Sequence, residues 1–122
     1  MEALTAQQAL DLARLICPAW REERGCVIRA DTYEPGNFSR WWAAAEGKHG
    51  SVEAGLNHLH LWDMLPVTDE HDYGELWDLG EVMVRAWQTT IARDFPGREF
   101  QVSLDDDYGP TVCVVSVRTD GV

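Results

Sequence analysis

Residues 57–63 read Asn-His-Leu-His-Leu-Trp-Asp, and they decide how the middle of the chain is expected to fold. If this stretch is a strand, His58 and His60 point to the same face, whereas on a helix they diverge. Residues 51–62 alternate, and one side carries the two histidines with Val52, Ala54 and Leu56. Because a turn signal, Gly47-Lys48-His49-Gly50, precedes this alternation, we expect a strand over 51–62.

Two further strands are expected on the N-terminal side of this segment. Residues 38–45 contain both Trp-Trp and Ala-Ala-Ala, so local propensity favours neither strand nor helix. Turn signals at Glu34-Pro35-Gly36-Asn37 and at 47–50 leave about eight residues between them, which is strand length. A short strand over 26–33 precedes the first turn. The sequence therefore predicts three strands joined by tight turns.

Two helices are expected around this group of strands. Thr5 and Gln8 form a capping box for a helix over 5–17, which Pro18 ends. The second helix has the clearest periodicity in the chain, and Phe95-Pro96-Gly97 ends it. Its apolar positions are Leu76, Leu79, Met83, Ala86, Trp87, Thr90 and Ile91. The acidic loop before it offers Asp72, with Glu75, as the N-terminal cap.

The chain ends in a predicted hairpin. Residues 100–104 alternate, 105–110 form an acidic loop, and 111–118 return as a strand that is apolar on both faces and so belongs inside the sheet. The order is helix, three strands, helix, two strands. We expect one α+β domain over residues 1–122, with a mostly antiparallel sheet of about five strands and both helices packed on one face.

Charge limits the classes of partner. The formal net charge is −11, and residues 49–84 contain eight acids and no Lys or Arg. Such a field repels nucleic acid and anionic membranes and accelerates encounter with a basic partner. No apolar run approaches the roughly 20 residues of a membrane span. Three scattered cysteines within apolar runs indicate reduced, buried thiols and a cytoplasmic protein. We expect the source to be bacterial.

His58 and His60 are the candidate metal ligands. On a strand, their alternation would suit two imidazoles converging on one zinc ion. Asp63, Glu53 and His71 are the local candidates for a third ligand, with Asp63 the nearest in sequence. The alternative, which we favour because the same face carries Val52, Ala54 and Leu56, is a hydrogen-bonded pair at the edge of the core. The sequence contains no nucleophile, phosphate-binding or zinc-protease motif. We therefore expect neither a cofactor nor catalytic residues.

Acidic and aromatic residues predict a binding surface instead. The candidates are Asp69, Glu70, Asp72, Trp41, Trp42 and Trp77. Exposed Trp among acidic residues is typical of a contact surface for a basic or amphipathic partner. The negative charge, the expected architecture and the large number of Trp residues are similar to those of small immunity proteins that neutralise basic toxins. This similarity is an analogy and does not rest on a sequence motif. Two alternatives stay open: a metal-assisted enzyme at His58 and His60, and a structural homodimer that presents its sheet or Trp41-Trp42.

Overall fold

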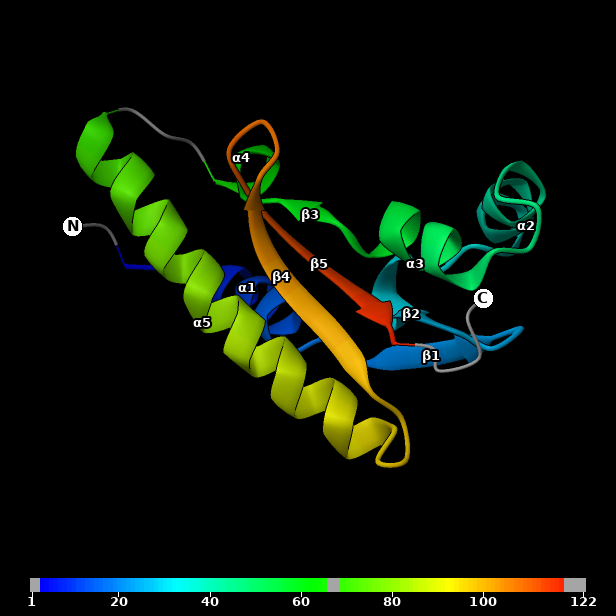
Figure 1. Ribbon diagram of the computed structural model, residues 1–122. Helices are drawn as coiled ribbons and strands as arrows, with labels where there is room; N and C mark the ends of the chain where they lie inside the picture. The colour runs from blue at the N-terminus through cyan, green and yellow to red at the C-terminus, as the bar shows by residue number, and fades with distance from the viewer. Residues whose placement is uncertain (1–2, 66–68, 118–122) are drawn as a thin grey trace.

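The computed structural model describes residues 3–65 and 69–117, without the side chains of His71 and Asp72. In that range it combines five α-helices, one 3-10 helix and two small antiparallel sheets (Figure 1), which confirms the α+β class. The elements in chain order are α1 (Ala6–Ile16), β1 (Trp20–Glu23), β2 (Cys26–Arg29), η1 (Ala30–Thr32), α2 (Pro35–Ala44), α3 (His49–Asn57), β3 (Leu59–His60), α4 (Leu61–Met64), α5 (Glu70–Asp94), β4 (Phe100–Asp106) and β5 (Pro110–Ser116).

The prediction of one five-stranded sheet is wrong. β1 and β2 form one sheet, and the other has the order β3-β5-β4. The C-terminal hairpin is confirmed, with Phe100 paired with Ser116 and Asp106 with Pro110, so part of the predicted acidic loop belongs to β4. The interior position of β5 is also confirmed. It follows from the apolar character of both faces of this strand.

Helix α1 is confirmed with its cap. The Thr5 side chain accepts from the Gln8 amide at 3.1 Å, and the Gln8 side chain accepts from the Thr5 amide at 2.9 Å. Both donors are among those that a helix start leaves unpaired, so the capping box fixes where α1 begins.

Helix α2 replaces the strand predicted over 38–45. Pro35 and Gly36, taken for a turn, open the helix instead, because Pro at the first helical position loses no needed hydrogen bond. The Glu34 carboxylate caps it by accepting from the amides of Gly36 and Asn37. These two hydrogen bonds hold the pKa of Glu34 below its ordinary value. The three alanines then continue as helix rather than strand.

Helix α3 replaces most of the strand predicted over 51–62, and only Leu59 and His60 of that stretch form a strand, β3. Its buried residues are Val52, Glu53 and Asn57, a spacing of one and four that belongs to a helix. The expected alternation placed Glu53 and Asn57 on the side of the strand opposite Val52, Ala54 and Leu56, away from the face expected to be buried against the helices. The structure buries them because each meets backbone groups that have no strand partner.

Those two side chains join the sheets. Glu53 accepts from the amides of Val27 in β2 and Ser116 in β5, at 2.7 and 2.9 Å, and also from the Ser116 hydroxyl at 2.6 Å. Asn57 accepts from the Arg29 amide and donates to the carbonyls of Val27 and Val114. Strand β5 continues past Leu59, the first residue of β3. There the outward backbone groups of β2 and β5 are hydrogen-bonded by side chains of α3 and not by another strand.

Arg98 extends this junction to the first hairpin. Its guanidinium donates to the Ser116 hydroxyl and the Gly25 carbonyl, both at 3.0 Å, and to the Glu22 carboxylate at 2.8 Å. The hairpin itself was not predicted. Its signal was Gly25, which with Arg24 adopts the positive φ that a tight turn requires.

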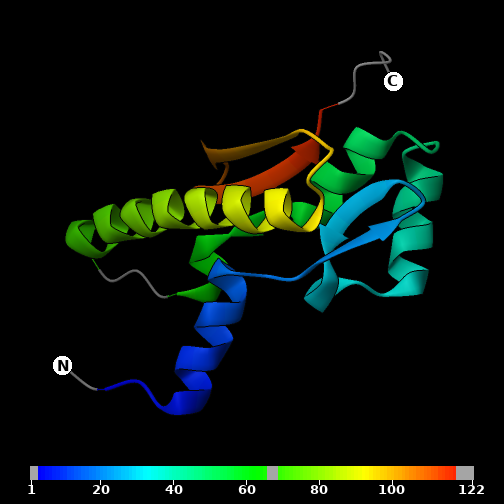
Figure 2. The same ribbon diagram turned by 90° about the horizontal axis from the view of Figure 1, so that it is seen from below.

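Helix α5 ends before Phe95-Pro96-Gly97, as predicted, but begins at Glu70. The predicted cap at Asp72 is therefore wrong, since Asp72 lies inside the first turn. The helix packs along β4 and β5, whereas α3, where a strand was predicted, packs against β5 and β2 (Figure 2). Gly80 permits the close approach, because a Cβ there would lie 2.7 Å from Leu104.

The cores divide in the same way. One cluster, under α5, contains Trp20, Leu61, Met83, Trp87 and Val112, and a smaller one beside α2 and α3 contains Cys26, Ile28, Phe38 and Val52. None of the helices in the described residues combines the length and the apolar character that crossing a bilayer requires.

The three cysteines form no disulfide with one another, but they are not all buried as predicted. Cys26 is buried and Cys113 half-buried, whereas Cys17 is exposed at the end of α1. Burial raises the pKa of the Cys113 thiol, and Asp105 raises it further. A raised pKa leaves little thiolate at neutral pH, so Cys113 is a poor nucleophile.

Candidate functional site

Three aromatic side chains form a continuous cluster where α4 meets the start of α5. The Trp62 and Tyr73 ring centroids lie 5.6 Å apart, and those of Tyr73 and Trp77 lie 6.3 Å apart. Tyr73 and Trp77 share a helix face because they are four residues apart. Trp62 is 47% exposed, so the cluster presents a ring at the surface as well as packing within itself.

The β4–β5 turn lies beside α4, the helix that carries Trp62 (Figure 1). A Cβ atom on Gly109 would lie 3.1 Å from the Trp62 ring, which explains why glycine stands here with φ +94°. The Gly109 amide donates to the Asp106 carboxylate at 3.1 Å, which fixes the turn. Beside Gly109, Tyr108 is 84% exposed. The turn thus adds a second exposed aromatic ring and the acids of its own loop.

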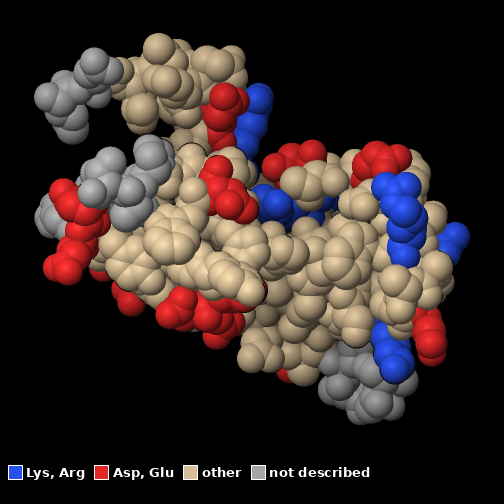
Figure 3. Space-filling model, turned by 90° about the horizontal axis from the view of Figure 1, so that it is seen from above, with Lys and Arg blue, Asp and Glu red and all other residues tan. Residues whose placement is uncertain are grey.

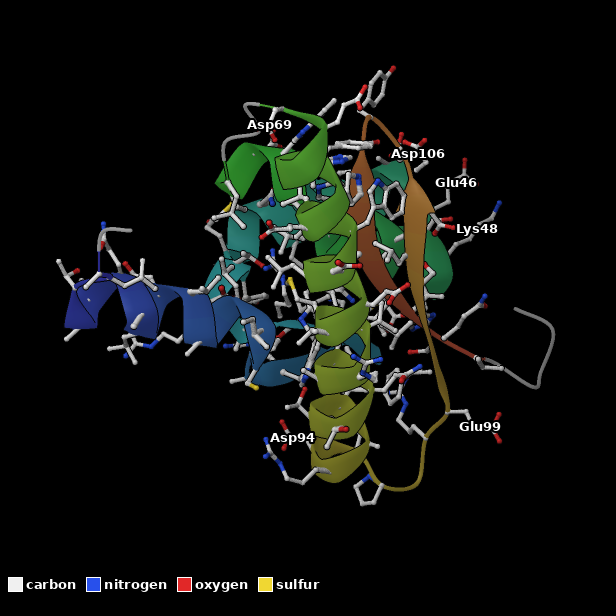
Figure 4. All side chains as sticks on the ribbon, turned by 90° about the vertical axis from the view of Figure 1, so that its left-hand side faces the viewer. Glu46, Lys48, Asp69, Asp94, Glu99 and Asp106 are labelled. Atoms are coloured by element: carbon white, nitrogen blue, oxygen red, sulfur yellow. The ribbon has the colours of Figure 1, made fainter. Side chains whose placement is uncertain are left out.

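Acidic side chains lie in the same segments as these rings, at the start of α5 and in the β4–β5 hairpin. Asp69 and Glu70 are exposed at the start of α5, and Asp105, Asp106 and Asp107 are exposed on the hairpin. Figure 4 shows Asp69 and Asp106 at one end of the molecule, with Asp94 and Glu99 at the other. In Figure 3 acids line the left-hand edge of the body, and most of the bases lie over the opposite end. We call Trp62, Tyr73, Trp77, Tyr108, Asp69, Glu70, Asp106 and Asp107 the acidic aromatic surface.

The structure separates the predicted binding residues into two groups. Trp77, Asp69 and Glu70 belong to the acidic aromatic surface, while the Asp72 side chain lies outside the described residues. Trp41 and Trp42 lie on α2, at the far end of the molecule (Figure 1). There the Trp42 ring stacks on Phe38 at 6.0 Å, and Trp41 covers Gly55, so tightly that a Cβ there would overlap the indole.

Sequence reasoning missed Trp62, Tyr73 and Tyr108 as site residues. The i, i+4 spacing of Tyr73 and Trp77 was a usable signal, but the predicted loop over 66–73 concealed it. Trp62 and Tyr108 are 46 residues apart in the sequence, and only the tertiary structure brings Trp62 against the turn that carries Tyr108. Glu53 was counted in the acidic stretch but is fully buried, so it adds nothing to the surface charge.

His58 and His60 are brought together, as the strand interpretation required, although His58 ends α3 and His60 lies in β3. Their ring centroids are 4.9 Å apart. His58 Nδ1 is hydrogen-bonded with the Ala54 carbonyl at 3.1 Å, and His60 Nδ1 with the Thr111 hydroxyl at 2.8 Å. These contacts suit the hydrogen-bonded pair that the sequence favoured.

A third metal ligand is not in place in the described residues. Within them, no group of three or more His, Cys, Asp and Glu side chains is arranged to hold a metal ion. Asp63 is exposed on α4, and Glu53 is held by β2 and β5. The His71 side chain lies outside the described residues.

Comparison of the chain with protein-family models, with curated proteins and with solved structures found no match.

Proposed function

We propose that this protein acts without catalysis, by binding a basic protein partner at the acidic aromatic surface. The observation that carries the proposal is the half-exposed Trp62–Tyr73–Trp77 cluster with acids on both of its flanks. Indole and phenol rings supply large, rigid contact area and accept a guanidinium on their faces, and carboxylates nearby attract and orient that group. The role that fits this chemistry is an immunity-like one, neutralising a basic protein in a bacterial cytoplasm.

The contribution of the acidic residues to binding is tested with a triple variant that combines Asp69→Asn, Glu70→Gln and Asp72→Asn. With an arginine-rich peptide as the probe, we expect association to slow by about tenfold at low salt, because steering depends on the summed field. The difference should nearly vanish at about 1 M salt, where the Debye length is about 3 Å. Stopped-flow fluorescence measures both rates, and an acidic peptide of equal length controls for unspecific binding.

A matched variant separates local from global charge. Glu46→Gln, Asp94→Asn and Glu99→Gln together remove an equal number of charges elsewhere. Glu46 follows α2 at the far end of the molecule (Figure 1), and Asp94 and Glu99 lie at the end opposite Asp69 and Asp106 (Figure 4). This control should change the association rate much less. Equal slowing in both triple variants would show that only net charge matters, and an unchanged rate in the first would refute the proposal.

The contribution of the aromatic residues to binding is tested by comparing substitutions of two exposed tryptophans. Trp62→Ala should weaken peptide binding by about 2 kcal/mol or more, mainly through faster dissociation. Trp41→Ala is the control, because Trp41 is 38% exposed but lies on α2. Equal losses in the two variants would place the contact elsewhere.

A metal-assisted role is the second candidate, which the 4.9 Å approach of the His58 and His60 rings favours. Zinc bound in this way should raise the melting temperature of protein purified without a histidine tag, and His58→Ala should abolish that increase. Elemental analysis of the purified protein gives the stoichiometry. No bound metal and no shift with zinc, manganese or iron would remove this candidate.

A further inference from the structure

An apolar groove of about 310 Å³ lies between α1 on one side and α4, α5 and β3 on the other. Its walls include Leu4, Leu12 and Leu15 from the N-terminal segment, Leu61 and Met64 from α4, and Leu79 from α5. Asp11 is the charged residue in its lining. The groove is therefore suited to an apolar, weakly charged occupant and not to a cationic one.

Helix α1 itself is incompletely covered. It projects from the body (Figures 2 and 4) and contains no buried residue, although it is rich in leucine and alanine. Leu4 is 62% exposed on the groove side. Leu10 is 45% exposed. It lies on a different side of the helix from Leu12 and Leu15, because these residues follow it by two and five positions, which correspond to rotations of about 200° and 140° around the helix axis. Apolar side chains of α1 therefore extend beyond the side that lines the groove, and such a side is usually packed against another surface.

Charge distinguishes between the possible occupants. The protein carries −11, so two copies repel each other wherever acids meet. On α1, however, Asp11 and Arg14 cancel, and the rest of the helix is uncharged. A basic partner would leave its charges unmatched in the groove, whereas a second α1 brings a neutral, leucine-bearing helix to a nearly neutral, leucine-lined groove.

We propose that a second copy of this chain docks here, with α1 of each copy lying in the groove of the other. Such an exchange is two-fold symmetric, so a single self-complementary surface closes the dimer without leading to filaments. It covers the exposed sides of Leu4, Leu10 and Met64 in both copies at once. This contact differs from a dimer through Trp41-Trp42, which lie on α2.

The test is sedimentation velocity on the full chain over a wide concentration range. We expect a dimer for the wild type. For Leu4→Glu and for Met64→Glu we expect a dissociation constant of the dimer at least about tenfold higher, because each substitution places a charge in the apolar contact. Both residues are exposed, so both variants should fold, as circular dichroism can confirm. Val82→Glu is the matched control, since Val82 is 43% exposed on α5 and does not line the groove.

Three outcomes would overturn the proposal. The first is a wild type that stays monomeric at high concentration. The second is a dimer that all three variants weaken equally, because the added charge and not its position would then be responsible. The third is a monomer whose melting temperature rises with an added leucine-rich helical peptide, which would assign the groove to a foreign helix.

Discussion

Replacing Glu53 with alanine should lower the free energy of unfolding by about 3–5 kcal/mol, a large part of the stability of a domain this size. Three donors lose their acceptor at once: the amides of Val27 and Ser116 and the Ser116 hydroxyl. All of them are buried, so water cannot replace the carboxylate without entering the junction between the sheets. The side chain also leaves a cavity, because Glu53 is fully buried.

Urea unfolding followed by circular dichroism measures this loss. Ser51→Ala, exposed on the same helix, controls for helix propensity and should change the free energy of unfolding by less than about 0.5 kcal/mol. Glu53→Gln keeps the volume but turns one acceptor into a donor that faces N–H or O–H groups, so we expect a loss of about 1–3 kcal/mol. A Glu53→Ala protein with nearly wild-type stability would contradict the proposed junction.

Trp87→Ala should be similarly destabilising, at about 3–5 kcal/mol. Trp87 is fully buried in α5, and its ring meets Trp20 edge-on at 5.4 Å between centroids. Its Nε1 donates to the Leu15 carbonyl at 3.0 Å, so it also ties α1 to the body. The Arg29 guanidinium lies 5.7 Å from its ring centroid, and burial lowers the pKa of Arg29. Loss of the indole leaves that cation without its aromatic neighbour.

A phenylalanine at position 87 separates these contributions. Trp87→Phe keeps an aromatic ring in the core but removes the donor to Leu15, and we expect a loss of about 1–2 kcal/mol. Hydrogen exchange should then quicken in α1 more than in α5, because only α1 loses an anchor. Thr89→Ala, exposed on the same helix, is the control. Uniform exchange changes across both helices would argue against a local role in holding α1.

Local chemistry explains the parts of the fold that the sequence predicted. The capping box of Thr5 and Gln8, the stop at Pro96 and the alternation of the C-terminal hairpin each act within a few residues. The predictions at 38–45 and 51–62 failed where the local signals were ambiguous. Pro35-Gly36 can begin a helix as well as a turn, and only the carboxylate cap of Glu34 distinguishes the two.

The sequence predicted the kinds of residue that form the candidate surface but not which residues belong to it. The acidic segment and Trp77 were evident from the residues alone. Trp62 and Tyr108 could not be placed, because α4 and the β4–β5 turn meet through the pairing of β3 with β5, which is a long-range contact. Trp41 and Trp42 do not belong to the surface, also because of a long-range arrangement. The packing of α2 against α3 places both residues at the other end of the molecule.

By itself, the sequence determined the class of the fold, the limits of α1, the C-terminal end of α5, the C-terminal hairpin and the strong negative charge. These depend on hydrogen bonds and periodicity within single segments, and on a simple sum of charges. The tertiary structure alone decided that the strands divide into two sheets, with Glu53 and Asn57 at their junction, and that Trp62 faces an acidic surround. Burying a polar side chain is favourable only when unpaired backbone groups from distant segments come to meet it, and no local pattern records that meeting.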